Sequence, residues 1–524
     1  MTTMHDFAQA QSEYPLVTPT AEPGSFSIEV VEDMYLTLRG DRANVFDICH
    51  KYFLGDHTRP YAPRESSDQI RDLQERSITN WIPLLVNLPS QVSFVDGYRR
   101  GTFGKTTEPD GKNLPAGSVK HFSPEYECWQ KNGMDAKQAV IYRAALTYGH
   151  AFVHVNNLDP KNVKLEVLST RNTVAYFDDP INDVIPAYTL TIKSYARDDK
   201  RPGLAILWDK EKRYEMDFSA NQEFTLRGEG IPHNLDACPV VRYTCYIDDE
   251  GATSGVILPI IPMQDRVNQA AFSTNITADF GAFKVRTAAG LQVNFKIDPT
   301  TGEALIDPVT GKPIPEPIAI SQAKLLVSGN PDTKFGQLDE TPLAGYLLAE
   351  DQATKNLAAI AQFPLHALLG NVSNLSAEAL NALEAQFMRF LQHLHTNWGE
   401  SHEQLFRLTA KAMDDAAGAE SFGGEVRWRD MSSKAFSAML DGLAKGVDSL
   451  GIPQRAAWAL IPGVTSGTLQ DWEVLKDDEV SEMQMNGIDP VTASRRNANG
   501  NQPAIPAPAP KPAAAPKPAA NGGK

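Results

Sequence analysis

The sequence has little cysteine. Cys49, Cys128, Cys238 and Cys245 are the only four among 524 residues, and no two of them form a C-x-x-C pair. This scarcity argues against a zinc site and against a disulfide framework. Free thiols in the reducing cytoplasm are the ordinary expectation for such a chain.

Long apolar runs are missing as well. No stretch of about 18 apolar residues occurs, so no membrane-spanning helix is expected. The first residues, MTTMHDFAQAQSEYPL, have neither the basic start nor the apolar centre of a signal peptide. We therefore expect no membrane partner.

The sequence has fewer basic than acidic residues. The chain has 49 Lys and Arg residues against 65 Asp and Glu residues, which gives a formal net charge of −16. Phosphate binding is driven by Lys and Arg, so this balance does not favour loose attachment to nucleic acid or to anionic lipid. It is compatible with a protein past which DNA must slide without sticking.

Catalytic patterns are incomplete wherever they begin. Gly104-Lys105-Thr106 resembles the end of a phosphate-binding loop, but Arg99 occupies the position of the required glycine. His402-Glu403 begins like H-E-x-x-H, but Phe406 stands in place of the second zinc ligand. We predict no enzyme, no cofactor and no metal site.

What is present begins with helical patterns. The apolar spacing predicts helix over residues 31–52, which Gly40-Asp41 could divide, and over 69–89, where Pro83 must kink or interrupt it. Residues 135–148 resemble a helix with Asp135 as N-cap and Gly149 after its end.

The next hundred residues favour strands. Short β-rich segments are separated by Asn, Asp, Gly and Pro, which predicts an antiparallel sheet region. These segments are residues 151–155, 164–168, 187–195, 205–208, 213–218 and 240–247.

A helix, an insertion and a second helix follow. The helices are predicted from Met263 to residue 280 and over residues 342–362, and residues 283–340 form a β-and-turn insertion between them. Within the insertion D-P-x-T-G occurs at Asp298–Gly302 and again at Asp307–Gly311, and each copy fits a turn.

The last third of the chain is mainly helical in pattern. A loop over residues 365–376 leads to Ser376, which is placed to cap a long helix with an apolar stripe and a plausible bend at Gly399. A strand over 425–428, a helix over 432–447 and a short helix near 454–460 follow. From residue 497 the chain is rich in Asn, Gly, Ala and Pro, which predicts a disordered tail.

Six segments in this order resemble the portal proteins, or head-to-tail connectors, of bacteriophages with long non-contractile tails. The resemblance covers residues 31–475. Its segments are KYFLGDH (51–57), NWIPLLVNLPSQVSFVDGY (80–98), residues 129–155, CPVVRY (238–243) with Ser254-Gly255, Gln264, Asp265 and Asn268, residues 363–380 before the long helix, and residues 426–446.

The resemblance implies an α+β portal fold with a β-rich wing, a helical stem, a small α/β clip, a long linking helix and a helical crown. The expected divisions are an N-terminal arm (1–30), the wing (31–257), a first stem helix (258–282), the clip (283–340), a second stem helix (341–363), a tunnel loop (364–376), the long wing helix with a return strand (377–429), the crown (430–480) and a disordered tail (481–524).

It also implies a structural role without enzymatic activity. The resemblance implies a homo-oligomeric ring of about twelve subunits, closed by cyclic symmetry, at one vertex of the virion capsid. Its implied partners are the terminase packaging motor, the head–tail adaptor, the major capsid protein and double-stranded DNA passing through without sequence specificity. Assembly would take place in the cytoplasm of the bacterial host.

The implied contact residues belong to two segments. Those of the tunnel loop, facing DNA in the channel, are Leu365, His366, Leu368, Leu369, Asn371, Val372 and Asn374. Those of the clip, facing the motor and adaptor, are Asp298, Gly302, Asp307, Gly311 and Lys312. Two other readings stay open: another phage head or adaptor protein, and a hydrolase using a site near His402.

Overall fold

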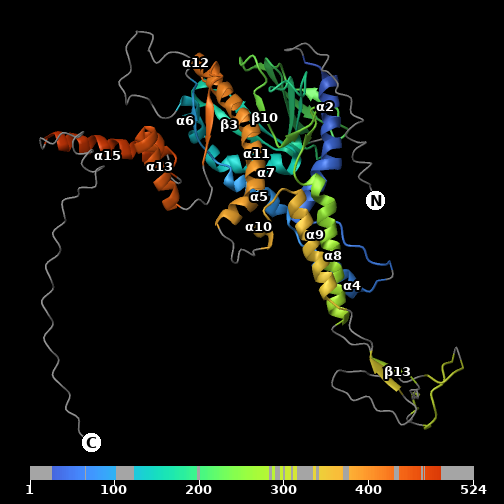
Figure 1. Ribbon diagram of the computed structural model, residues 1–524. Coiled ribbons are helices and arrows are strands. Elements are labelled where there is room, and N and C mark those ends of the chain that lie inside the picture. The colour runs from blue at the N-terminus through green and yellow to red at the C-terminus, as the bar shows by residue number, and fades with distance from the viewer. Residues whose placement is uncertain are drawn as a thin grey trace, which may run out of the picture. The chain divides into compact units, whose positions relative to one another are not determined.

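The computed structural model shows two compact units, Met1–Trp428 and Arg429–Lys524. The residues that it describes are 26–64, 66–101, 123–197, 201–281, 286–289, 295–298, 301–308, 311–314, 334–337, 342–369, 377–429, 436–461, 464 and 466–485. Helices and antiparallel sheets are mixed along the first unit (Figure 1). The predicted α+β class is confirmed.

The first helical region is continuous where a break was expected. Helix α2 (Ile28–Asp41) runs into a π-helical segment (Arg42–Phe46) and then into α3 (Asp47–Leu54). At Gly40-Asp41 the helix therefore widens instead of stopping. Because α2 already begins at Ile28, the last residues of the expected N-terminal arm are helical, while residues 1–25 lie outside the described part of the chain.

The next helices end and begin at proline and glycine, as their backbone chemistry requires. Pro83 lies in the first turn of α5 (Ile82–Val92), which is separate from α4 (Asp68–Arg76). Helices α6 (Pro124–Lys131) and α7 (Met134–Tyr148) follow, and Gly149 ends α7 at φ 100°.

The prediction that Asp135 caps α7 is wrong. Gly133, at φ 62°, is the N-cap residue. The Asp135 carboxylate instead accepts a 2.8 Å hydrogen bond from the indole Nε1 of Trp129. A carboxylate in the first turn of a helix has several donors within reach, and the sequence does not decide among them.

The predicted sheet region forms two main antiparallel sheets. Three strands pair in the order β10-β2-β3, and five pair in the order β4-β5-β6-β7-β8, with β9 paired to β7. The first sheet contains β2 (His150–Asn156), β3 (Lys164–Leu168) and β10 (Val240–Thr244). The second contains β4 (Thr173–Tyr176), β5 (Tyr188–Ser194), β6 (Gly203–Trp208), β7 (Lys212–Phe218), β8 (Phe224–Leu226) and β9 (Ile231–Pro232).

Alternating side chains arrange these sheets in layers. Leu207 on one face of the larger sheet shares a buried cluster with Met34 of α2. Trp208 on the opposite face packs with Phe152 of the smaller sheet. The next residue along β2, Val153, faces the largest cluster, to which α7 and a long helix contribute. Because successive side chains of a strand point to opposite faces of its sheet, each of these two sheets contributes to two buried clusters.

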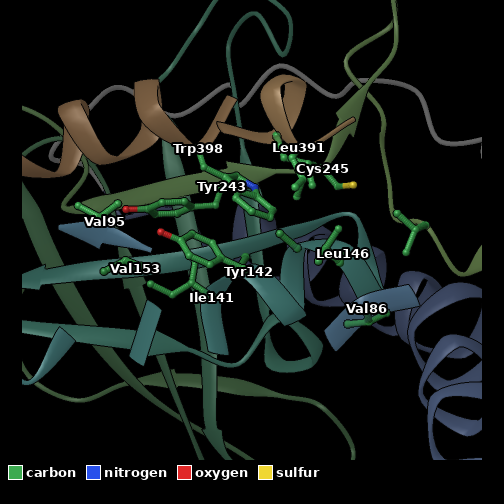
Figure 2. Packing of buried hydrophobic residues seen from close by; sticks show 14 of the residues in the cluster. Val86, Val95, Ile141, Tyr142, Leu146, Val153, Tyr243, Cys245, Leu391 and Trp398 are labelled. Atoms are coloured by element: carbon green, nitrogen blue, oxygen red, sulfur yellow. The ribbon is translucent and has the colours of Figure 1, made fainter. Parts of the chain in front are cut away.

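That long helix, α11 (Ala377–Ala412), holds the centre of the first unit. Its Trp398 stacks on Tyr142 of α7 with ring centroids 4.4 Å apart, and Figure 2 shows both side chains inside the cluster. The helix continues through Gly399. The short helix α12 (Ala416–Ala419) follows, and β15 (Glu425–Trp428) then returns to pair with β1 (Val95–Arg99).

Two helices form a hairpin around the insertion. Helices α8 (Ile261–Gly281) and α9 (Ala344–Ile360) lie side by side, and α4 lies beside α8 (Figure 1). Of the insertion, β13 (Arg286–Ala289) pairs with β14 (Lys334–Gln337). The strands expected near residues 318–320 and 325–327 lie outside the described residues. The small pair β11 (Tyr246–Ile247) and β12 (Thr253–Ser254) precedes α8.

The second unit contains α13 (Phe436–Leu450), α14 (Gln454–Ala459) and α15 (Ser466–Met485). Trp458 and Trp472 meet edge to face, with centroids 5.8 Å apart, and join α14 to α15. Helix α15 was not foreseen, and its last turn lies within the segment expected to be disordered. In the described part of the chain, no helix is both long and apolar enough to cross a membrane.

Candidate functional site

The expected tunnel loop is helical in its first part. Residues Leu365–Leu369 form the short helix α10. Leu368 is only 6% exposed and belongs to the main core, and Leu365 packs against that core. In the single chain the apolar side chains of residues 365 and 368 therefore serve packing, and a contact of Leu368 with DNA stays a prediction.

The other tunnel residues divide into two groups. Nε2 of His366 lies 3.6 Å from Oε1 of Glu384 on α11. The side chain of Leu369, and all of Asn371, Val372 and Asn374, lie outside the described residues. Of the expected tunnel residues, the structure therefore describes the side chains of Leu365, His366 and Leu368.

The clip residues form two matching turns. The Gly302 N–H donates to the Asp298 carbonyl oxygen, and the Gly311 N–H donates to that of Asp307, both at 2.9 Å. Both glycines have positive φ, 71° and 65°. Glycine adopts this conformation without steric cost, which explains why each turn closes on glycine. The Asp307 N–H then donates to the Lys312 carbonyl oxygen at 2.9 Å.

These turns belong to a nine-residue repeat that closes on itself. The Leu305 N–H donates to the carbonyl oxygen of Lys296, the Ile314 N–H to that of Leu305, and the Lys296 N–H to that of Ile314. The three donor–acceptor distances are 2.7 to 3.0 Å. Residues 296, 305 and 314 occupy the same position in successive repeats. The repeated turn pattern therefore builds one small three-segment meander.

Three sequence segments that are far apart meet at the start of α8. The first is the KYFLGDH segment, where Gly55 at φ 92° ends α3 and turns the chain. His57 then lies buried, with Nε2 2.9 Å from the Tyr52 carbonyl oxygen and 3.1 Å from Oδ1 of Asn80. Asn80 is in the second segment, and its Nδ2 donates to the Phe53 carbonyl oxygen at 3.3 Å.

The third segment is α8 itself. Nδ2 of Asn268 lies 3.0 Å from Nδ1 of His57, and Oδ1 of Asn268 accepts from the Thr79 N–H at 3.1 Å. Gln264 donates through Nε2 to the Thr79 carbonyl oxygen at 2.7 Å, and its Oε1 accepts from the Trp81 N–H at 3.2 Å. We call His57, Asn80, Gln264 and Asn268 the joint cluster.

An ionisable pair flanks the joint cluster. The Tyr52 hydroxyl donates to Oδ1 of Asp265 at 2.8 Å. Burial raises the pKa of Tyr52 to about 12. Burial also raises the pKa of the Asp265 carboxyl, against the opposing effects of the Tyr52 hydroxyl and of His57. The sequence comparison had marked Asp265, but no pattern assigned it this partner.

His402 lies in the core, where both of its ring nitrogens are within hydrogen-bond distance of tyrosine hydroxyls. Its Nε2 is 2.7 Å from the Tyr142 hydroxyl and its Nδ1 is 3.0 Å from the Tyr243 hydroxyl. Burial lowers its pKa to about 3, which keeps the ring neutral. Among the described residues no three His, Cys, Asp or Glu side chains gather as a metal site.

Comparison with known proteins decides which family has this arrangement. A family model described as "Phage portal protein, SPP1 Gp6-like" matches residues 42–483. This chain belongs to that phage portal family. The match runs from the π-helical segment into α15 and includes the joint cluster, the α8–α9 hairpin and α11. Its role is that of a portal protein at a capsid vertex.

Solved structures are similar at low identity. The neck of a native gene transfer agent particle computed with C12 symmetry contains a chain 12% identical, with 79% of this chain and 98% of that chain covered and a TM-score of 0.38. A chain in the neck of an empty gene transfer agent particle computed with C6 symmetry is 11% identical, with 77% of this chain and 96% of that chain covered and a TM-score of 0.40. An HK97 family phage portal protein from Corynebacterium diphtheriae is 8% identical, with 73% of this chain and 98% of that chain covered and a TM-score of 0.29. No curated protein matches the sequence. Because these TM-scores are below 0.5, membership of the portal family rests on the family model.

Proposed function

We propose that this portal protein assembles into a closed ring with cyclic symmetry, of about twelve copies as the resemblance implies, and that this ring forms the channel for genome packaging and ejection. The observation that carries the proposal is the family match over residues 42–483, which spans both compact units. In this proposal residues 31–257 are the wing, α8 and α9 the stem, residues 283–340 the clip and residues 430–480 the crown.

The charge balance supports a channel that does not bind DNA tightly. A basic lining would bind DNA through counterion release. With a net charge of −16 per chain, a ring of such subunits would carry a large negative charge, which opposes binding of the phosphate backbone. Double-stranded DNA would then pass without sequence-specific contacts, and Asn371, Val372 and Asn374 remain the proposed channel-facing residues.

The clip meander supports a contact role for the insertion. Its apolar side chains are unusually open to solvent for a small folded segment, and exposed apolar surface of this kind commonly marks protein contacts. These side chains are Phe295 (44% exposed), Ile297 (64%), Leu305 (40%) and Ile306 (60%). We propose that this segment, with Asp298, Gly302, Asp307, Gly311 and Lys312, meets the terminase motor and later the head–tail adaptor.

Labelling in particles tests the role. A chain tagged after residue 524 would be supplied to particle-forming cells, and purified particles would be treated with a gold-labelled antibody to the tag. The proposal predicts label at a single vertex, the vertex that bears the tail, next to the major capsid protein. Label spread over all capsid faces would identify a different head protein and would refute the proposal.

A further inference from the structure

Helix α8 packs against the rest of the first unit along one broad face. Val267 and Phe272 on this face are apolar and are 1% and 3% exposed. Gln264 and Asn268 lie between them around the helix and are fully buried although they are polar. Burying two amides is costly unless every polar atom finds a partner, so their contacts define what this face does.

Those contacts reach main-chain groups rather than other side chains alone. Gln264 and Asn268 bond the main chain at Thr79 and Trp81. At the next residue along the helix, Oε1 of Gln269 accepts from the Tyr61 N–H at 2.7 Å. A helix held by apolar contacts can slide by small steps, whereas bonds to fixed N–H and C=O groups fit only one position of the helix.

The donor and acceptor roles at His57 follow from the same geometry. The Tyr52 carbonyl oxygen can only accept, so Nε2 donates to it, and Nδ1 accepts from Nδ2 of Asn268. Asn268 cannot turn its amide over, because its Oδ1 already accepts from the Thr79 N–H and from Nε2 of Gln264. Every member of the chain of bonds therefore determines the orientation of the next.

We propose that the joint cluster is a register lock, which fixes the axial position and direction in which α8 leaves the body of the first unit. His57, Asn80, Gln264 and Asn268 are positioning residues in this account. The lock itself is a property of the single chain. Its consequence, that all copies in a ring present their α8–α9 hairpins identically to one channel, rests on the proposed function.

Distance measurement by electron–electron double resonance tests the lock. All four native cysteines are buried, so spin labels can be directed to Leu348→Cys on α9 and Leu158→Cys in the loop after β2, positions 68% and 61% exposed. Labelled chains are diluted into unlabelled chains, so that only distances within one chain are measured. We expect a narrow distribution that broadens or shifts when Asn268→Leu is added, with helical content unchanged by circular dichroism.

A matched substitution serves as control. Asn356→Leu makes the same chemical change on α9, where Oδ1 of Asn356 accepts from Nε2 of Gln352 in the same helix, and should leave the distribution narrow. Asn268→Asp keeps an oxygen that can accept from the Thr79 N–H and from Nε2 of Gln264 and loses the donor to Nδ1 of His57, so it should broaden the distribution less than Asn268→Leu. An unchanged distribution in Asn268→Leu, or equal broadening in Asn356→Leu, would overturn the lock.

A milder variant keeps the test decisive if Asn268→Leu does not fold. Gln269→Leu removes one hydrogen bond, from Tyr61, at a half-buried position, and should broaden the distribution to a smaller extent. No broadening there would count against the lock. A failure of ring assembly would refute the proposed function but leave these intramolecular distances, and hence the lock, unaffected.

Discussion

Three histidines of the first unit are held uncharged by burial. Burial lowers the pKa of His402 to about 3, that of His150 to about 3 with help from Arg242, and that of His395 to about 4. In the unfolded chain the same rings titrate near pH 6.5. Below that pH these histidines bind protons in the unfolded state but stay neutral in the folded state, so acid favours unfolding.

The sign of the pH effect follows directly. The contribution of each histidine is fully present above about pH 6.5 and is lost as the pH falls toward 4, by up to about 1.4 kcal/mol per pH unit. Urea denaturation between about pH 7 and pH 5 should show a falling midpoint. His402→Gln, which keeps a donor and an acceptor for the two tyrosines, should make the decline shallower. A midpoint independent of pH would contradict this account.

Leu368 offers a second test at the level of one side chain. Because it is 6% exposed within the main core, Leu368→Ala should lower the free energy of unfolding by about 2–5 kcal/mol. Leu348→Ala, at a position 68% exposed, should change it by less than about 0.5 kcal/mol. Equal small effects in urea denaturation would show that α10 does not belong to the core.

At the scale of elements, the clip meander depends on its two left-handed glycines. Gly302→Ala forces a Cβ into φ 71° and should cost about 1 kcal/mol, so that the Leu305 and Ile314 amides exchange about five times faster. If Gly302→Ala left the exchange of the meander amides unaffected, the turn at Gly302 would not stabilise the meander.

Gly345→Ala lies within α9, where the added Cβ meets no atom within 4 Å, and should stabilise its helix by about 0.5–1 kcal/mol.

Element by element, the sequence predicted what local chemistry decides. The strands β2, β3 and β7 and the end of α7 at Gly149 follow from alternation and from glycine, and all are found within one residue. The segment at Leu365 was taken for a loop, because five residues of helix leave too short a periodic signal. Helix α15 was missed because its apolar residues do not keep to one face.

The division of the strands between two sheets was also beyond the sequence. Phe152 and Val153 both look like core residues, and nothing local shows that they enter different clusters. The pairing of β1 with β15 joins residues more than 300 positions apart. Such contacts depend on the whole chain and not on a window of residues.

At the scale of the whole molecule, the candidate site could be recognised but not understood from sequence. KYFLGDH, Asn80, Gln264 and Asn268 were marked by resemblance to portal proteins, yet no pattern showed that they bond one another. Hydrogen bonds between segments about 20 and 200 residues apart become visible only once the chain is folded. Conversely, the order helix, insertion, helix and long helix was clear from periodicity alone.

Electron microscopy of the chain expressed alone tests the central claim most directly. Class averages of the purified protein are predicted to show rings of about twelve subunits around a channel wide enough for a DNA duplex. A chain that stays monomeric on concentration would contradict the claim that this portal protein builds the channel by itself.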